Sequence, residues 1–327
     1  MSPPPAGHGL DAHDLGPQLA PALIETCEAS GAGPIDGLRW FRTDWQRGGA
    51  ATAYATFSPP DGEPREVVVK FPVGPMEYRF TTGLAQTDAP TPRVVHHGVE
   101  LGGWDFAWLV MERVPGDPLA AHLHKEVFEE LADAAARFYL RASQRWPMDV
   151  VPVREDWPHL LDRARENARI NPIPHAQEWT NAIKNTQKVI DRIATEWNAR
   201  TVTNWCHGDL HAGNLMRRAE DSPWGPTECV LLDLAEVHPG HWVEDAVYLE
   251  RLYWMRPDAL KGVKPVSLIA RARKKHNLDT SDDYQRLADI RRVLMASCAP
   301  AFLQSEGHPR YLEAALGVLE KTLPRVA

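Results

Sequence analysis

The segment that decides the fold reads His207-Gly208-Asp209-Leu210-His211-Ala212-Gly213-Asn214, and nineteen residues after Asn214 comes the Asp of Leu231-Leu232-Asp233. Together they place a carboxylate, a carboxamide and a second carboxylate in a fixed order. Transfer of a phosphoryl group depends mainly on positioning the acceptor hydroxyl and on neutralising charge with Mg²⁺. An Asp can orient that hydroxyl and take its proton, and the oxygens of Asn and Asp are suitable Mg²⁺ ligands. The residue types therefore indicate a phosphoryl-transfer site.

The spacing within these segments agrees with this interpretation. Asp209 and Asn214 are five residues apart, which is the Asp-to-Asn spacing of the protein-kinase catalytic loop H-R-D-x-x-x-x-N. Gly208 takes the place of the Arg of that loop. The apolar run Cys229–Leu232 predicts a strand that leads into Asp233.

Two other interpretations of the first segment are open at this point. Gly and Asn favour loops, so the match could be an ordinary turn. His207, Asp209 and His211 could also bind zinc, because His and Asp are ordinary zinc ligands. No H-E-x-x-H or C-x-x-C motif accompanies them. Two linked motifs in the right order favour phosphoryl transfer.

With these motifs, and with a further Asp twelve residues beyond Asp233, the sequence resembles the aminoglycoside phosphotransferase and choline kinase-like family of small-molecule kinases. The resemblance implies a two-lobed, protein-kinase-like α+β fold, in which a small antiparallel sheet with one helix precedes a larger, mainly helical lobe. It implies ATP or GTP as the phosphate donor. The site residues that it implies are Asp209 as catalytic base, Asn214 and Asp233 as Mg²⁺ ligands, and His207 and Asp245 as structural supports.

The first third of the chain predicts the nucleotide-binding lobe. Met1–Pro17 is expected to be a flexible tail, and Leu19–Ser30 a helix. The strands of a five-stranded antiparallel sheet are expected at Leu38–Phe41, Ala53–Phe57, Glu66–Phe71, Arg93–His97 and Phe106–Met111. The predicted lobes are residues 18–113 and 114–327.

Lys70 lies on the third of these strands, where a buried charge is costly unless it is paired. In the kinase arrangement such a Lys spans the α and β phosphates and is held by a Glu on a helix. Glu77, on the segment Pro75–Gln86, is the acidic candidate. The alternative is a Lys that reaches water from a strand end. Gly48 and Gly49 would let the backbone approach phosphates, although any hairpin turn can use such a pair.

The fifth strand runs into Glu112–Gly116, which resembles the hinge that connects the lobes in this family. Main-chain groups near Glu112 and Val114 would bond the base of the nucleotide. Side-chain identities do not show which of these groups does so.

Beyond the hinge the apolar spacing is helical. Helices are expected at Val127–Arg145, Ala176–Asn198 and Trp242–Trp254, and further helices to about Leu323, with an approximation to a capping box at Thr280-x-x-Asp283. The acceptor site is expected among them. Candidates to hold or stack on a cationic acceptor are Asp156, Asp162, Glu166, Glu236, Trp157, Trp179, Trp242 and Trp254. Taken singly, such acids usually solvate a surface and such tryptophans usually pack a core.

The composition narrows the class of protein further. The 327 residues include 36 Lys and Arg against 44 Asp and Glu, and the net charge of −8 argues against a nucleic-acid partner. No stretch has the length of a membrane span or of a signal-peptide core, so a cytoplasmic protein without a membrane partner is expected. The cysteines at 27, 206, 229 and 298 are far apart, which favours reduced thiols; Cys206 beside the motif could be reactive or could simply pack. The basic run Arg271–Lys275 is expected to be a solvated helix face.

The sequence thus predicts a kinase that transfers the γ-phosphate of ATP or GTP to a hydroxyl of a small molecule such as an aminoglycoside-like antibiotic, an amino alcohol or a sugar. One alternative is a nucleotide-binding pseudokinase that acts as an interaction module. A protein kinase is disfavoured because Gly208 replaces the Arg of the kinase loop and no Asp-Phe-Gly or Ala-Pro-Glu motif follows Asp233. A zinc hydrolase is the third alternative. The acceptor and the oligomeric state cannot be derived from the sequence.

Overall fold

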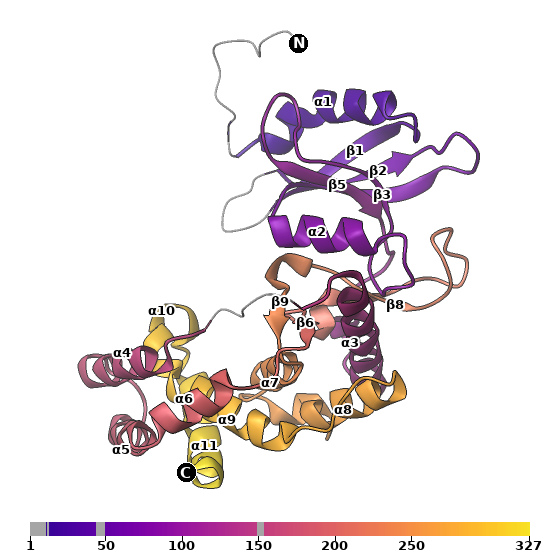
Figure 1. The fold of residues 1–327 in the computed structure, drawn as a ribbon. Coiled ribbons are helices and arrows are strands. Elements are labelled where there is room, and N and C mark those ends of the chain that lie inside the picture. The colour runs from indigo at the N-terminus through magenta and orange to yellow at the C-terminus, as the bar shows by residue number, and fades with distance from the viewer. Residues whose placement is uncertain (1–10, 12, 44–49, 149–153) are drawn as a thin grey trace. The chain divides into compact units, whose positions relative to one another are not determined.

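The computed structural model describes residues 11, 13–43, 50–148 and 154–327, which form two compact units (Figure 1). The first unit comprises the described residues of Met1–Ala121 together with Gly213–Val237, and the second comprises those of His122–Ala212 and His238–Ala327. The sequence predicted a single boundary between residues 113 and 114. The structure differs because the chain returns to the first unit after residues 207–212, the catalytic segment, which carries the predicted base Asp209.

A five-stranded antiparallel sheet forms the centre of the first unit, as predicted. Its strand order is β1-β2-β3-β5-β4. The strands are β1 Ile35–Arg42, β2 Ala51–Phe57, β3 Arg65–Val73, β4 Val94–Gly98 and β5 Ala107–Glu112. Along β2 every second residue is buried, which is the period expected when one face of a strand packs on a core.

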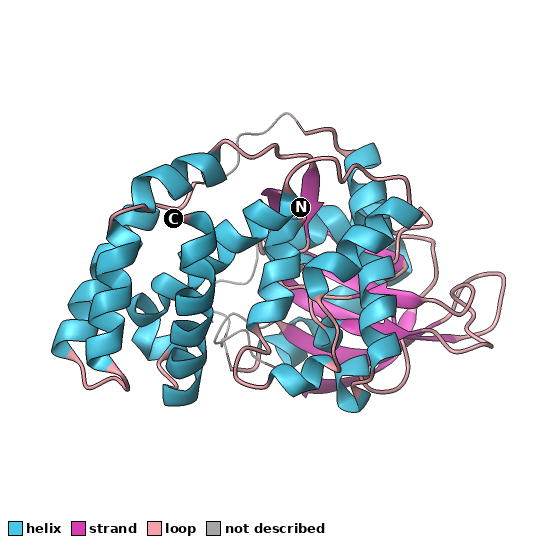
Figure 2. Ribbon diagram, turned by 90° about the horizontal axis from the view of Figure 1, so that it is seen from below, coloured by secondary structure: helices cyan, strands magenta, loops and turns pink. Residues whose placement is uncertain are grey.

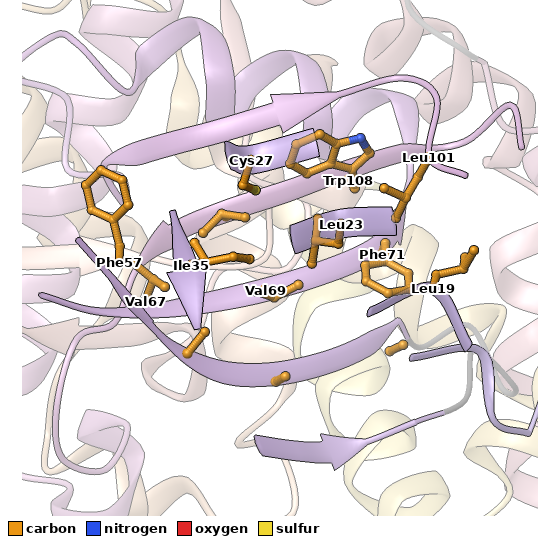
Figure 3. Packing of buried hydrophobic residues seen from close by; sticks show 14 of the residues in the cluster. Leu19, Leu23, Cys27, Ile35, Phe57, Val67, Val69, Phe71, Leu101 and Trp108 are labelled. Carbon is orange, nitrogen blue, oxygen red and sulfur yellow. The ribbon is translucent and has the colours of Figure 1, made fainter. Parts of the chain in front are cut away.

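Helix α1 (Leu15–Ala29) covers one face of this sheet. Its buried side chains Leu19, Leu23 and Cys27 pack in one cluster with Val67 and other residues of the strands (Figure 3). The helix begins at Leu15, so the last residues of the expected tail are helical; Leu15 itself is buried in the same cluster.

Helix α2 (Pro75–Leu84) lies on the opposite face of the sheet. Because side chains alternate along a strand, the burial of Val69 and Phe71 against α1 turns Lys70 toward the α2 side. Glu77 lies in the first turn of α2. The strand register therefore carries Lys70 to the helix that bears its acidic partner.

The returning segment of the first unit consists of strands β7 (Leu215–Arg217) and β8 (Cys229–Leu231), flanked by the 3₁₀ helices η3 (Ala212–Asn214) and η4 (Leu234–Glu236). The main-chain N–H of Leu231 donates to Pro90 O at 2.7 Å. This bond joins the hairpin to the segment before β4, which is also part of the first unit.

The second unit is mainly helical (Figure 2). Its helices are α3 Lys125–Arg145, α4 Trp157–Ile170, α5 Ala176–Gln187, α6 Ile190–Asn198, α7 Val243–Arg251, α8 Pro265–Lys275, α9 Tyr284–Ser297, α10 Leu303–Glu306 and α11 Pro309–Val326. Two short strands, β6 (Asn204–Cys206) and β9 (His238–Gly240), pair antiparallel beside the catalytic segment.

The helix predictions needed three corrections. The segment Ala176–Asn198 is two helices, because Val189 leaves the helical range at φ −125° and breaks the hydrogen-bond ladder. Helix α4 was not predicted, because two of its four buried positions are alanines and the apolar pattern is weak. The cap of α9 is Asp283 rather than Thr280: its carboxylate accepts the N–H of Arg286 at 3.1 Å.

Candidate active site

Lys70, Glu77 and Asp233 meet in the first unit. The Nζ atom of Lys70 lies 2.5 Å from Oε1 of Glu77 and 3.8 Å from Oδ1 of Asp233. Burial raises the pKa of Glu77; the charge of Lys70 opposes this shift, and the charge of Asp233 adds to it. The structure thus brings the predicted Lys–Glu pair together and places the second motif's carboxylate next to it.

Asp233 follows β8 directly and adopts the left-handed conformation, with φ +57°. Asp tolerates this region better than most residues with a side chain. The side chain remains 49% exposed. The N–H of Leu232 donates to Asn214 O at 2.8 Å, so the main chain holds the two predicted Mg²⁺ ligands side by side.

A cavity of about 480 Å³ opens within the first unit at this cluster. This size falls in the range of small-molecule and cofactor sites. The predicted site residues among its lining are Lys70, Glu77, Glu112, Val114, Asn214 and Asp233. The predicted phosphate-loop glycines, Gly48 and Gly49, lie outside the described residues.

The hinge residues Glu112 and Val114 differ in their main-chain bonding. The N–H of Glu112 donates to Arg93 O at 2.7 Å. In the part of the chain that the structure describes, the main-chain groups of Val114 form no hydrogen bond with another main-chain group. Among the described residues, the main-chain N–H and C=O of Val114 therefore have no main-chain partner, as the predicted contact with a nucleotide base requires.

Arg218, which the sequence did not single out, fixes the Glu112 side chain. Its guanidinium forms two parallel bonds with the Glu112 carboxylate, Nε to Oε1 at 2.6 Å and Nη2 to Oε2 at 2.8 Å. It also pairs with Glu228, although it is only 1% exposed. Such a fork is specific to Arg. The pair ties the start of the hinge to the β7–β8 segment.

The catalytic segment of the second unit is anchored on Asp245, in the first turn of α7. The buried carboxylate accepts the N–H groups of His207 at 2.7 Å and Gly208 at 2.9 Å. The hydroxyl of Tyr139 donates to the same carboxylate at 2.8 Å. Gly208 has φ +84°, a conformation that an Arg would adopt only with strain. The Gly in place of the kinase Arg is therefore a requirement of this backbone.

His207 is fully buried beside the ring of Phe138. Its Nδ1 accepts the N–H of Asp209 at 3.3 Å, so the imidazole closes the turn that presents Asp209, the predicted base. The zinc interpretation of His207, Asp209 and His211 is not supported by the distances between possible ligand atoms. Among the described residues, the group of three donors close enough to share a metal ion is Cys206, His238 and Glu244 instead.

The Asp209 carboxylate is 28% exposed and receives contacts that the sequence did not predict. The hydroxyl of Tyr248 donates a hydrogen bond to its Oδ1 atom. His211 Nε2 lies 3.3 Å from the same oxygen. No local motif marks Tyr248, because its partner lies 39 residues earlier in the sequence.

Cys206 is buried, with its Sγ 3.4 Å from the carbonyl of His241. Burial raises the pKa of its thiol, and the charges of Asp245 and Glu244 raise it further. The thiol therefore stays protonated at neutral pH, and a packing role replaces the reactive one.

The residues proposed to recognise the acceptor mostly serve the fold. Asp156 caps α4 by accepting the N–H of His159 at 3.1 Å. Glu166 forms a surface pair with Arg169 at 2.8 Å, and Asp162 accepts from a Gln side chain at 3.2 Å. Glu236 is exposed in η4 of the first unit. The tryptophans are buried: Trp157, Trp179, Trp242 and Trp254.

The basic run on α8 is only partly a solvated face. Arg271 and Lys274 are exposed as expected. Arg273 is buried, and its Nη1 donates to Asn204 Oδ1 at 2.8 Å. Lys275 pairs with Asp133 at 2.6 Å. One residue of the run therefore supports the β6 strand that precedes the catalytic segment.

The sheet with its Lys–Glu pair and the helical unit with its catalytic segment define the class: a two-lobed kinase-like fold. The family model described as the phosphotransferase enzyme family (APH) matches residues 30–299, so the chain belongs to this family. The chain is a small-molecule kinase. No curated protein was found to match the sequence.

Several solved structures share the fold. A microcompartment-associated aminopropanol kinase has a TM-score of 0.56, with 15% identity over 93% of this chain and 98% of its own. A choline kinase from Cryptosporidium parvum has a TM-score of 0.53, with 13% identity over 94% of this chain and 95% of its own. An aminoglycoside phosphotransferase from Alicyclobacillus acidocaldarius has a TM-score of 0.52, with 16% identity over 84% of this chain and 87% of its own.

Within the described residues, none of the helices is both long enough and apolar enough to cross a bilayer.

Proposed function

We propose that this kinase transfers the γ-phosphate of ATP or GTP to a hydroxyl group of a small molecule. The observation that carries the proposal is the cluster of Lys70, Glu77 and Asp233 at a cavity of about 480 Å³. Lys70 would fix the phosphates of the nucleotide, and Glu77 would hold Lys70 in place. GTP remains a candidate because a variant of an aminoglycoside 2′-phosphotransferase with the same fold was solved as its GDP complex.

The donor set suits Mg²⁺. Asp233 offers a half-exposed carboxylate and Asn214 a neutral amide oxygen, and both line the cavity. Hard oxygen ligands of this kind are those that Mg²⁺ prefers. When bound, Mg²⁺ would neutralise the charge that develops on the phosphates.

Asp209 would act as the catalytic base. The oxygen of the acceptor hydroxyl forms a bond to the γ-phosphorus, and the bond from that phosphorus to the β-γ bridging oxygen breaks. The hydroxyl proton passes to the Asp209 carboxylate, and the nucleoside diphosphate leaves. Tyr139 and the carboxylate of Asp245 support this base by fixing the main chain of the segment.

The acceptor is proposed to be an amino alcohol, an aminoglycoside-like antibiotic or a sugar. Three relatives of the same fold are described as acting on, or named for, aminopropanol, choline and aminoglycosides. These compounds share a hydroxyl group and a nitrogen that carries a positive charge at neutral pH.

The test is a mass-spectrometric screen of the purified full chain with Mg²⁺-ATP or Mg²⁺-GTP and a panel of hydroxylated amines, sugars and antibiotics. We expect one class of compound to gain the mass of one phosphate, and no gain with the Asp209→Ala variant. Tight nucleotide binding without turnover on any compound would favour the pseudokinase alternative. Turnover by Asp209→Ala equal to that of the wild type would contradict the assignment of the base.

A further inference from the structure

Helix α7 presents two side chains to the catalytic segment. Asp245 and Tyr248 are three residues apart, and residues at this spacing lie on the same face of a helix. Asp245 holds the main chain of the segment through the N–H groups of His207 and Gly208. Tyr248 contacts the side chain of the next residue, Asp209. One rigid helix thus fixes both the backbone and the carboxylate.

We propose that Tyr248 is a positioning residue for phosphoryl transfer, whose hydroxyl holds the Asp209 carboxylate in the orientation from which it accepts the proton of the acceptor. The inference rests on the proposed function, because it assigns a role relative to the same base. Tyr248 keeps its own proton throughout the step. The proton of the acceptor passes to Asp209 alone.

The geometry restricts the carboxylate at one oxygen. The Tyr248 hydroxyl donates to Oδ1, and His211 Nε2 lies 3.3 Å from the same atom. A carboxylate without such a donor can rotate about its Cβ–Cγ bond, since this terminal torsion is broad. A base must lie within hydrogen-bond reach of the proton that it takes. Restricting this rotation therefore raises the fraction of time in which Asp209 can act.

The surroundings keep Tyr248 a donor. Burial raises the pKa of its phenol, the hydrogen bond and charge of Asp209 raise it further, and Asp245 acts in the same direction. Arg251, one turn further along α7, opposes the shift. Arg251 is itself engaged with the hydroxyl of Tyr311 at 2.9 Å. The phenol thus stays protonated at neutral pH.

The first experiment compares steady-state kinetics of the wild type and Tyr248→Phe, which removes one oxygen and keeps the ring. The substrates are Mg²⁺-ATP with the acceptor found in the screen, and Mg²⁺-ATP with water alone. We expect kcat to fall about 10- to 100-fold, as for the loss of a hydrogen bond to a charged group. The KM for Mg²⁺-ATP should stay within about twofold, because Tyr248 touches the base rather than the nucleotide-binding cluster.

Tyr253→Phe is the matched control. Tyr253 is buried, and its ring packs edge-on against Phe128 with centroids 5.7 Å apart. Loss of its hydroxyl should leave kcat unchanged. Equal kcat for Tyr248→Phe and the wild type would overturn the proposal, as would an equal fall in both variants.

The second experiment detects the contact without turnover. The full chain is labelled with 3-fluorotyrosine, and Tyr248→Phe assigns the ¹⁹F resonance of this residue. In Asp209→Asn the Tyr248 resonance should titrate at lower pH than in the wild type, because the charged acceptor is gone. An unchanged titration would overturn the contact itself.

The two experiments separate the failure of this inference from the failure of the proposed function. A wild type that phosphorylates no compound, with the ¹⁹F shift present, would overturn the function and leave the Tyr248–Asp209 contact in place. An active wild type with an unaffected Tyr248→Phe variant would overturn the inference alone.

Discussion

The two units hold their functional residues in different ways. In the first unit, Lys70 and Glu77 lie seven residues apart, on a strand and the helix that follows it. In the second unit, Asp209 depends on Tyr248 and Asp245, which lie 36 to 39 residues away along the chain. Local connectivity is enough to build the first arrangement. The second requires a helix to pack back against the catalytic segment.

The comparison predicts that the second unit carries the chemistry and the first the binding. Asp209→Ala should lower kcat by up to about 10⁴-fold, because it removes the base. Nucleotide affinity should be retained, since the Lys70 cluster belongs to the first unit. Isothermal titration with a non-hydrolysable nucleotide and a turnover assay measure the two effects. Glu129→Ala, on the exposed face of α3, serves as control; a matching loss of affinity in Asp209→Ala would break the comparison.

Arg218 offers the largest effect on the stability of the first unit. Arg218→Ala leaves the buried Glu112 carboxylate without its partner, and breaking such a pair costs about 3 to 4 kcal/mol. Denaturant unfolding measures this change. The control Arg113→Ala removes a more exposed pair with Glu66 and should cost below about 1 kcal/mol. Similar costs for the two variants would contradict the structural role of Arg218.

Glu244 makes the second unit sensitive to acid. Burial alone would raise the pKa of its carboxyl, but His238, Arg291, Arg200 and a main-chain N–H together lower it to about 2, from 4.5. A carboxyl whose pKa is lower in the folded than in the unfolded protein stabilises the fold at a pH above the unfolded pKa. This contribution is lost as the pH falls from 4.5 toward 2. The loss amounts to about 3 kcal/mol.

Urea unfolding of the wild type and Glu244→Gln across this range tests the prediction. The wild type should lose stability steeply below pH 4.5, and the variant should show a flatter dependence. Parallel curves would show that Glu244 does not set the acid stability.

Of these variants, Glu77→Gln should show the smallest loss of function. It tests whether Glu77 holds Lys70 in the cluster of Lys70, Glu77 and Asp233. The amide keeps the shape of the side chain but removes the charge that holds Lys70. We expect kcat/KM for Mg²⁺-ATP to fall about 10-fold, the loss of one charge-assisted bond. The pKa of Glu77 is raised, so the carboxylate becomes protonated and the Lys70–Glu77 pair weakens as the pH falls toward this pKa. The decline of kcat/KM on the acidic side of its pH profile should therefore be flatter in Glu77→Gln than in the wild type.

Much of the first unit could be predicted because its evidence is local. Alternation of apolar residues located the strands, and a β-branched run ending near Lys70 marked the central one. The Arg218 pair was missed because nothing in the sequence distinguishes a buried Arg from an exposed one beside it. Its partner Glu112 lies 106 residues earlier.

The helical unit was harder to predict. Helix α3 has a long apolar face and was found, whereas α4 presents Ala164 and Ala168 to the core and was not. The break near Val189 carries no Gly or Pro. Tertiary packing decided these boundaries.

The sequence by itself predicted a small-molecule kinase, because the order and spacing of Asp209, Asn214 and Asp233 suit phosphoryl transfer, and the family match agrees with this prediction. It also predicted the sheet, because side chains alternate between the two faces of a strand and this alternation is visible in consecutive residues. Only the tertiary structure decided which side chains hold these groups in place. Tyr248 and Arg218 act on partners that are distant in the sequence, and folding alone brings such residues within the few ångströms over which a hydrogen bond acts.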